Sequence, residues 1–190
     1  MELLEQRILT DGKLLPGGIL KVDSFLNHQI DPTLLQAMAR EFCRLFEDAG
    51  VSRVLTIEAS GIALAVLTGL ELGCPVVFAK KSKSKNLSDE LYKTEIPSFT
   101  HGKVNTVVVS RAYLHPGDRV LLIDDFLATG AALIGLRDLV GQAGGTVVGA
   151  GVAVEKVFQE GGNRLRESGL RVEALARIAA MDENGIRFAR

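Results

Sequence analysis

Several features that would by themselves assign a function class are scarce in this 190-residue sequence. It has only two cysteines, Cys43 and Cys74, and they lie in apolar stretches without metal-ligand spacing, so we expect reduced core thiols rather than a disulfide framework. The 22 basic and 23 acidic residues leave a net charge of −1, which excludes a strong overall field for nucleic acid or anionic lipid. No stretch approaches the roughly 20 apolar residues of a membrane-spanning helix, and the first residues lack the apolar core of a secretory signal. We therefore expect a cytoplasmic protein that binds neither nucleic acid nor membranes.

The residues that are present predict one compact domain, because 47% of the chain is apolar and no linker or internal repeat divides residues 1–190. Short β-branched runs alternate with longer amphipathic segments, which indicates an α/β fold with a twisted, mostly parallel sheet and helices on both faces. Strands are predicted at Arg53–Glu58, Val76–Lys80, Thr106–Ser110, Arg119–Asp124, Thr146–Glu155 and Arg171–Ile178. Helices are predicted at Glu2–Asp11, Pro32–Ala49, Ile62–Gly73, Ala131–Ala143 and Asn163–Ser168.

The most informative stretch begins with the strand at residues 120–123, which is apolar at every position and so should be covered on both faces. It ends in Asp124 and Asp125, which we expect to face outward, and continues through a turn of small residues into a helix. Backbone N–H groups at a helix N-terminus favour a phosphate, and the carboxylates can accept hydrogen bonds from sugar hydroxyls or hold a hydrated Mg²⁺. Thr129 is also suited to cap the helix, and capping by Thr129 and the acidic pair alone is the alternative reading.

The thirteen residues at 120–132 resemble the signature of the type I phosphoribosyltransferases, which bind 5-phosphoribosyl 1-pyrophosphate (PRPP) in this loop. The resemblance implies that Asp124 and Asp125 are the catalytic carboxylates on the ribose hydroxyls. It places the 5′-phosphate on five turn residues: Ala128, Thr129, Gly130, Ala131 and Ala132. It implies Mg²⁺ as the cofactor, bound mainly by the substrate, with no metal site made by the protein alone. The family is generally dimeric, so a homodimer is expected by analogy.

A second strand-to-helix turn, at Ala59, Ser60 and Gly61, has the same pattern, and the resembled family uses the equivalent loop for pyrophosphate. A purely structural turn is the alternative. The cluster of lysines after the strand at 76–80 includes Lys81, which we assign to pyrophosphate, although a solvated charge run would look the same. In the family a flexible loop follows this strand and closes over the site, so residues 80–106 are expected to form such a flap, with a plain surface excursion as the alternative.

The wider resemblance runs along nearly the whole chain and is strongest to the xanthine-transferring members of the family, on residues 20–32 and 154–158. It implies a base-binding hood made by residues 1–35 and 154–190, in which Leu20, Asn27 and Lys156 contact xanthine. Core packing, a turn and a surface lysine are the alternatives for these three. Related hypoxanthine and guanine enzymes place an aspartate at the position of Ala128, and its absence here favours xanthine, whose ring is more acidic.

These patterns predict a purine-salvage enzyme that makes xanthosine 5′-phosphate and pyrophosphate from xanthine and PRPP. Two alternatives stay open at this point. One is a phosphoribosyltransferase for adenine or another purine. The other is a purine regulator that uses the same fold to sense the donor, although the balanced charge and the short segment at residues 1–18 argue against a DNA-binding module.

Overall fold

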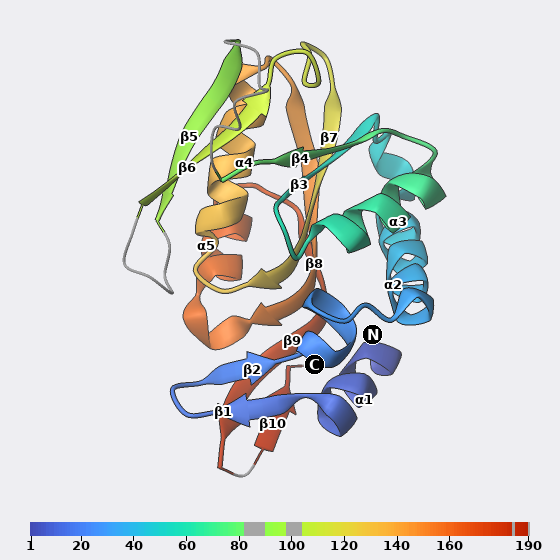
Figure 1. The fold of residues 1–190 in the computed structure, drawn as a ribbon, viewed down its shortest axis with the longest axis vertical. Helices are drawn as coiled ribbons and strands as arrows, with labels where there is room; N and C mark the ends of the chain where they lie inside the picture. Colours follow the sequence, from blue (N-terminus) through green and yellow to red (C-terminus); the bar gives the residue numbers. More distant parts are fainter. Residues whose placement is uncertain (82–89, 98–103, 184, 190) are drawn as a thin grey trace.

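The computed structural model describes residues 1–81, 90–97, 104–183 and 185–189, and within them a six-stranded sheet forms the centre of the molecule (Figure 1). Its strand order is β10-β9-β8-β7-β3-β4. All neighbouring strands run parallel except β10, which is antiparallel to β9. The strands are β3 (Arg53–Ile57), β4 (Val76–Ala79), β7 (Arg119–Leu127), β8 (Thr146–Lys156), β9 (Val172–Asp182) and β10 (Gly185–Phe188).

Helices cover both faces of this sheet, as the sequence predicts. Helices α1 (Glu2–Asp11), α2 (Pro32–Leu45) and α3 (Ile62–Leu72) pack on one face in one apolar cluster. Helix α4 (Ala131–Gln142) and α5 (Gly161–Glu167) contribute to a second cluster on the other face. The predicted helix at 32–49 is shorter than expected, because α2 ends at Leu45 and a separate 3-10 turn covers Glu47–Ala49.

Strand β7 contributes side chains to both apolar clusters. Its apolar residues alternate between the clusters, with Leu121 and Ile123 on the α2/α3 face and Val120 and Leu122 on the α4 face. The strand is longer than predicted and continues through the two aspartates to Leu127, still paired with β8. Asp124 and Asp125 are therefore inside the strand and buried, with exposed fractions of 5% and 8%, and the expectation that they face outward is wrong.

The segment at 80–106, predicted as a flap, contains regular structure. Strand β5 (Leu91–Pro97) pairs antiparallel with β6 (Val104–Ser110), and an isolated bridge from Lys80 to Val108 joins this hairpin to the edge of the sheet. Residues 82–89 and 98–103 lie outside the described residues. Closure of this segment over the site stays a prediction.

The two ends of the chain meet at one end of the molecule (Figure 1). Strands β1 (Lys13–Leu15) and β2 (Ile19–Lys21) form a hairpin, followed by a π-helical turn at Asp23–Asn27. This hairpin and α1 lie near β9 and β10, and α1 packs against β9. The predicted hood therefore has a structural counterpart, although its role in base binding is a prediction.

Two further expectations concern surface and redox chemistry. Cys43 and Cys74 are both free and partly buried, as predicted. Burial raises the pKa of the Cys43 thiol to about 11, and the charge of Glu71 adds to the shift. No helix in the described part of the chain combines the length and apolarity that crossing a bilayer would require.

Candidate active site

The loop that follows β7 forms a small cavity at the carboxyl end of the sheet. The cavity measures about 150 Å³ and is lined by Asp124, by the turn at 128–132 and by Pro97 of the β5–β6 hairpin. Helix α4 begins at Ala131, so its first free N–H groups face the turn. The predicted phosphate loop and one predicted carboxylate thus line the same space.

Gly130 determines how this loop enters the helix. It is the N-cap residue of α4 and has a φ of 84°, a conformation that residues with a side chain rarely adopt. The predicted capping by Thr129 is wrong, because the cap residue is Gly130 and no side-chain cap hydrogen bond is present. The Thr129 hydroxyl is therefore not committed to capping the helix.

Asp124 sits deepest in the site. Its Oδ1 accepts a hydrogen bond from the backbone N–H of Asp125 at 3.0 Å. Burial raises the pKa of Asp124 well above its ordinary value, and the neighbouring charge of Asp125 raises it further. The charge of Lys81 acts in the opposite direction, which places this lysine within electrostatic range of the carboxylate.

This environment predicts a pH-dependent gain of stability in Asp124→Asn. A carboxyl with a raised pKa in the folded state keeps its proton where the unfolded chain has lost it, so the free energy of unfolding falls as pH rises through that range. Asparagine removes this decline. We expect the variant to be more stable than the native protein at about pH 8, with the difference vanishing near about pH 4. Urea unfolding at both pH values tests this, and an equal difference at both would contradict it.

The second predicted loop lies beside the first. It connects β3 to α3, and β3 is the parallel neighbour of β7. A β carbon built on Gly61 would contact Thr56 Oγ1 and lie 3.3 Å from Asp124 Oδ1. Gly61, the last of the three predicted loop residues, therefore lies close to the Asp124 carboxyl group. The peptide between Glu58 and Ala59 is cis.

The two loops flank a topological switch point. The next strand along the chain, β4, lies on one side of β3 in the sheet. The later strands β7, β8 and β9 are added in order on the opposite side of β3. Ligands of open α/β sheets bind in the crevice that such a reversal leaves at the carboxyl ends of the strands. The arrangement predicts one ligand that contacts both loops.

A hydrogen bond from its own backbone N–H holds Lys81 in place. Its N–H donates to Glu58 Oε1 at 2.6 Å, which ties the end of β4 to the end of β3. The sequence gives no signal for this role of Glu58, because the two residues are 23 positions apart. Lys81 thus lies beside the start of the second loop, and its assignment to pyrophosphate stays a prediction.

The base-side residues reach the same region from the chain ends. Asn27 Nδ2 donates to Asp125 Oδ2 at 3.1 Å, across 98 positions of sequence. Lys156 ends β8, and its Nζ donates to the carbonyl of Gly18 at 3.1 Å and lies 5.8 Å from the centre of the Phe126 ring. Leu20 is the buried residue of β2 in the hairpin and belongs to the apolar core.

The environment of Lys156 is intermediate between core and surface. Burial lowers the pKa of its ammonium group. The ring of Phe126 offers a favourable face to the cation. Its partner in the hairpin is a backbone carbonyl, which the oxygen of a ligand can replace without leaving a charge unpaired.

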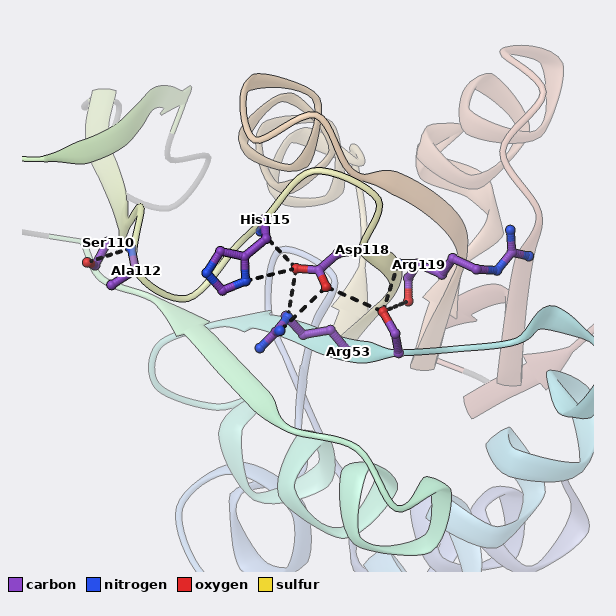
Figure 2. A network of polar contacts seen from close by, with 7 residues as sticks. Arg53, Ser110, Ala112, His115, Asp118 and Arg119 are labelled. Carbon is purple, nitrogen blue, oxygen red and sulfur yellow. Dashed lines mark hydrogen bonds and ion pairs between the residues drawn. The ribbon is translucent and has the colours of Figure 1, made fainter.

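A separate polar network lies at the other end of the sheet (Figure 2). Asp118, which precedes β7, accepts hydrogen bonds from Arg53 Nε at 2.9 Å and from the backbone of His115 at 2.8 Å. Burial opposes the charged form, but these bonds and the charge of Arg53 lower the pKa of Asp118 overall. Because this network joins the amino ends of β3 and β7, it fastens the strands on the side away from the site.

Comparison with known proteins agrees with this geometry. The phosphoribosyl transferase domain family matches residues 29–167. Xanthine phosphoribosyltransferases of Bacillus cereus (strain AH187) and Bacillus anthracis are each 50% identical over 188 residues, covering 99% of this chain and 95% of the relative.

Solved structures of adenine phosphoribosyltransferases share the fold. The enzyme of Giardia lamblia, complexed with 9-deazaadenine, superposes with a TM-score of 0.76 at 24% identity, covering 92% of this chain and 97% of that one. The enzyme of Rhodothermus marinus gives 0.75 at 22% identity, covering 93% and 99%. From its matched domain and from its identity to these relatives, the chain belongs to the phosphoribosyltransferase family, in the group of the xanthine phosphoribosyltransferases.

Proposed function

We propose that this protein transfers the 5-phosphoribosyl group of PRPP to xanthine, giving xanthosine 5′-phosphate and pyrophosphate in purine salvage. The observation that carries the proposal is the meeting of two strand-to-helix loops and two buried carboxyl groups at one switch point. The 50% identity to xanthine phosphoribosyltransferases supports the choice of base.

We assign the parts of the donor to successive groups of the site. The backbone amides of residues 128–132 bind the 5′-phosphate at the start of α4, where the helix dipole also favours an anion. Asp124 and Asp125 accept hydrogen bonds from the ribose hydroxyls. Ala59, Ser60, Gly61 and Lys81 bind the pyrophosphate.

Mg²⁺ fits the chemistry of the site, because carboxylate and phosphate oxygens are its preferred ligands. Asp124 and Asp125 would hold it through water, with the remaining ligands from the donor. Within the described residues no group of three or more acidic, histidine or cysteine side chains is placed to bind a metal. When bound, the ion neutralises charge on the pyrophosphate.

The base pocket suits a ring with two carbonyl groups. The Lys156 ammonium and the Asn27 amide are hydrogen-bond donors, and they pair with oxygens that adenine lacks. Leu20 is buried and would supply an apolar contact for the ring. Ala128 puts no carboxylate next to the base, and xanthine needs less help to lose its proton than hypoxanthine or guanine.

In the reaction a ring nitrogen of xanthine forms a bond to C1′ as the bond from C1′ to the pyrophosphate oxygen breaks. Positive charge develops on the ribose in between. The chain contributes by positioning the two substrates and by placing the side chains of Asp124, Asp125 and Lys81 around the reacting centre. The proton of the base leaves to solvent or to pyrophosphate.

We further infer a cytoplasmic homodimer, by analogy with the family. Sedimentation of the purified protein tests the dimer, and localisation of a tagged chain tests the compartment.

The assignment of the base is tested by a panel of xanthine, guanine, hypoxanthine and adenine with PRPP and Mg²⁺. We expect pyrophosphate release to be fastest with xanthine. The similarity to solved adenine phosphoribosyltransferases makes adenine the second candidate, and a preference for it would overturn the choice of xanthine. No turnover of any base would overturn the proposed function.

Lys156→Ala is expected to raise the KM for xanthine roughly 10-fold or more, because a hydrogen bond from a charged donor contributes about 1.5–3 kcal/mol. The KM for PRPP should stay near its native value. Lys21→Ala is the matched control. Lys21 is an exposed lysine in β2 of the hairpin that Lys156 contacts, and it pairs with Asp23. Steady-state kinetics with both substrates checks the prediction, and an unchanged KM for xanthine would remove Lys156 from the pocket.

A further inference from the structure

A buried carboxylate lies where β8 ends, next to Lys156 in the sequence. Glu155 is only 1% exposed. Its two oxygens accept a bidentate pair of hydrogen bonds from Arg166 at 2.7 and 2.8 Å, and Oε2 also accepts one from Arg177 Nε at 3.1 Å. Arg166 belongs to α5 and Arg177 to β9. The pair of bonds from Arg166 therefore fastens a helix to the central sheet.

The same helix supports the phosphate loop from behind. The backbone N–H of Gly161 donates to the carbonyl of Ala128 at 3.1 Å. A β carbon built on Gly161 would contact the backbone of Ala128 and Thr129, and one built on Gly130 would lie 3.2 Å from Leu165 Cδ1. The start of α5 and the loop are thus in direct contact over three residues of the loop.

The ion pair lies directly under this contact. A β carbon built on Gly162 would contact Glu155 Oε1 and lie 2.8 Å from Arg166 Nη1. Helix α5 has only 7 residues, and a helix this short is not stable without its tertiary contacts. Its position, and through it the position of the loop, depends on the bonds to Glu155.

We propose that Glu155 and Arg166 are positioning residues for the 5′-phosphate of the donor, acting through α5 on the loop at 128–130. They keep the loop amides in the arrangement that binds phosphate, so less ordering is needed when the donor arrives. The proposal rests on the proposed function, in which this loop binds the 5′-phosphate. It assigns these two residues to donor binding and not to the base.

The first test compares two arginines that share one carboxylate. Arg166→Met should raise the Kd of ribose 5-phosphate and the KM for PRPP about 10-fold, with kcat and the KM for xanthine within about twofold of native. Arg177→Met removes an equal charge from Glu155 without touching α5, and it should leave both donor constants within about twofold. Arg166→Lys keeps the charge, and it should recover part of the donor affinity. Calorimetry and steady-state kinetics give the constants, with thermal unfolding as the check on folding.

The second test changes no charge. Gly162→Ala places a methyl group against the ion pair and should raise the Kd of ribose 5-phosphate. Gly141→Ala in α4 is the matched control, because its β carbon would meet nothing within 4 Å and neither glycine has a positive φ. Native donor affinity in Gly162→Ala, or equal losses in Arg166→Met and Arg177→Met, would overturn the proposal. If the unmutated protein turned over none of the four bases, the proposed function would be overturned, and this proposal with it.

Discussion

Asp125→Asn is expected to lower kcat/KM for PRPP roughly 100-fold while the protein remains folded. Asp125 is buried at the end of β7, and its Oδ2 already accepts the Asn27 amide. Bonds to a charged acceptor contribute about 1.5–3 kcal/mol each, and the amide of asparagine loses this charge where the ribose hydroxyls and the developing positive charge lie. Steady-state kinetics with PRPP as the varied substrate, together with far-UV circular dichroism, measures the two parts of the expectation.

Asp118→Asn is the matched control for this variant, because Asp118 lies at the opposite end of the same strand and pairs with Arg53 (Figure 2). The pKa of Asp118 is lowered in the folded protein, so its loss should reduce stability at neutral pH and leave kcat/KM within about twofold of native. A native rate in Asp125→Asn would show that this carboxylate does not contact the reacting sugar.

Gly61→Ala is the second change with a large expected effect, a loss of about 10-fold or more in kcat/KM. The φ of Gly61 is −73°, which alanine adopts freely, so the substitution tests space alone. The added methyl group would meet the fully buried Thr56 hydroxyl and approach Asp124 Oδ1. The loop at residues 59–61, the Thr56 side chain or Asp124 must then move.

A second substitution can restore the lost space. Thr56 Oγ1 is buried and has no hydrogen-bond partner among the residues that the structure describes, so its removal costs little. The double variant Thr56→Ala/Gly61→Ala should therefore recover much of the activity that Gly61→Ala loses. Failure of the double variant to exceed the single one, or full activity of the single one, would contradict the steric explanation.

The sequence predicts the centre of the fold better than its periphery. The continuous apolar run at 120–123 and the small-residue turn after it predict a covered strand and an anion-binding loop. The structure contains the covered strand and a cavity beside the turn, and anion binding there stays a prediction. The four further strands predicted at the centre, at the positions of β3, β4, β8 and β9, are also present. Buried strands with both faces covered leave a strong apolar signal, which is why these were identified.

The other strands and the long-range contacts leave weaker patterns in the sequence. Strand β5 has only two buried apolar residues, Leu91 and Ile96, among polar ones, so it does not stand out from a loop. The three-residue strands β1 and β2 are too short for a periodicity to show. Glu155 bonds to residues 11 and 22 positions away, a separation that no local pattern encodes.

The adjacency of β3 and β7 has a wider meaning for how such enzymes diversify. The loops assigned to the donor extend from neighbouring strands at the middle of the sheet, whereas the segments assigned to the acceptor come from the two ends of the chain, at the margin of the sheet. Evolution can remodel those termini without shifting the register of the paired strands. One inherited scaffold can in this way retain a common phosphorylated sugar while the nucleobase it accepts changes between descendants.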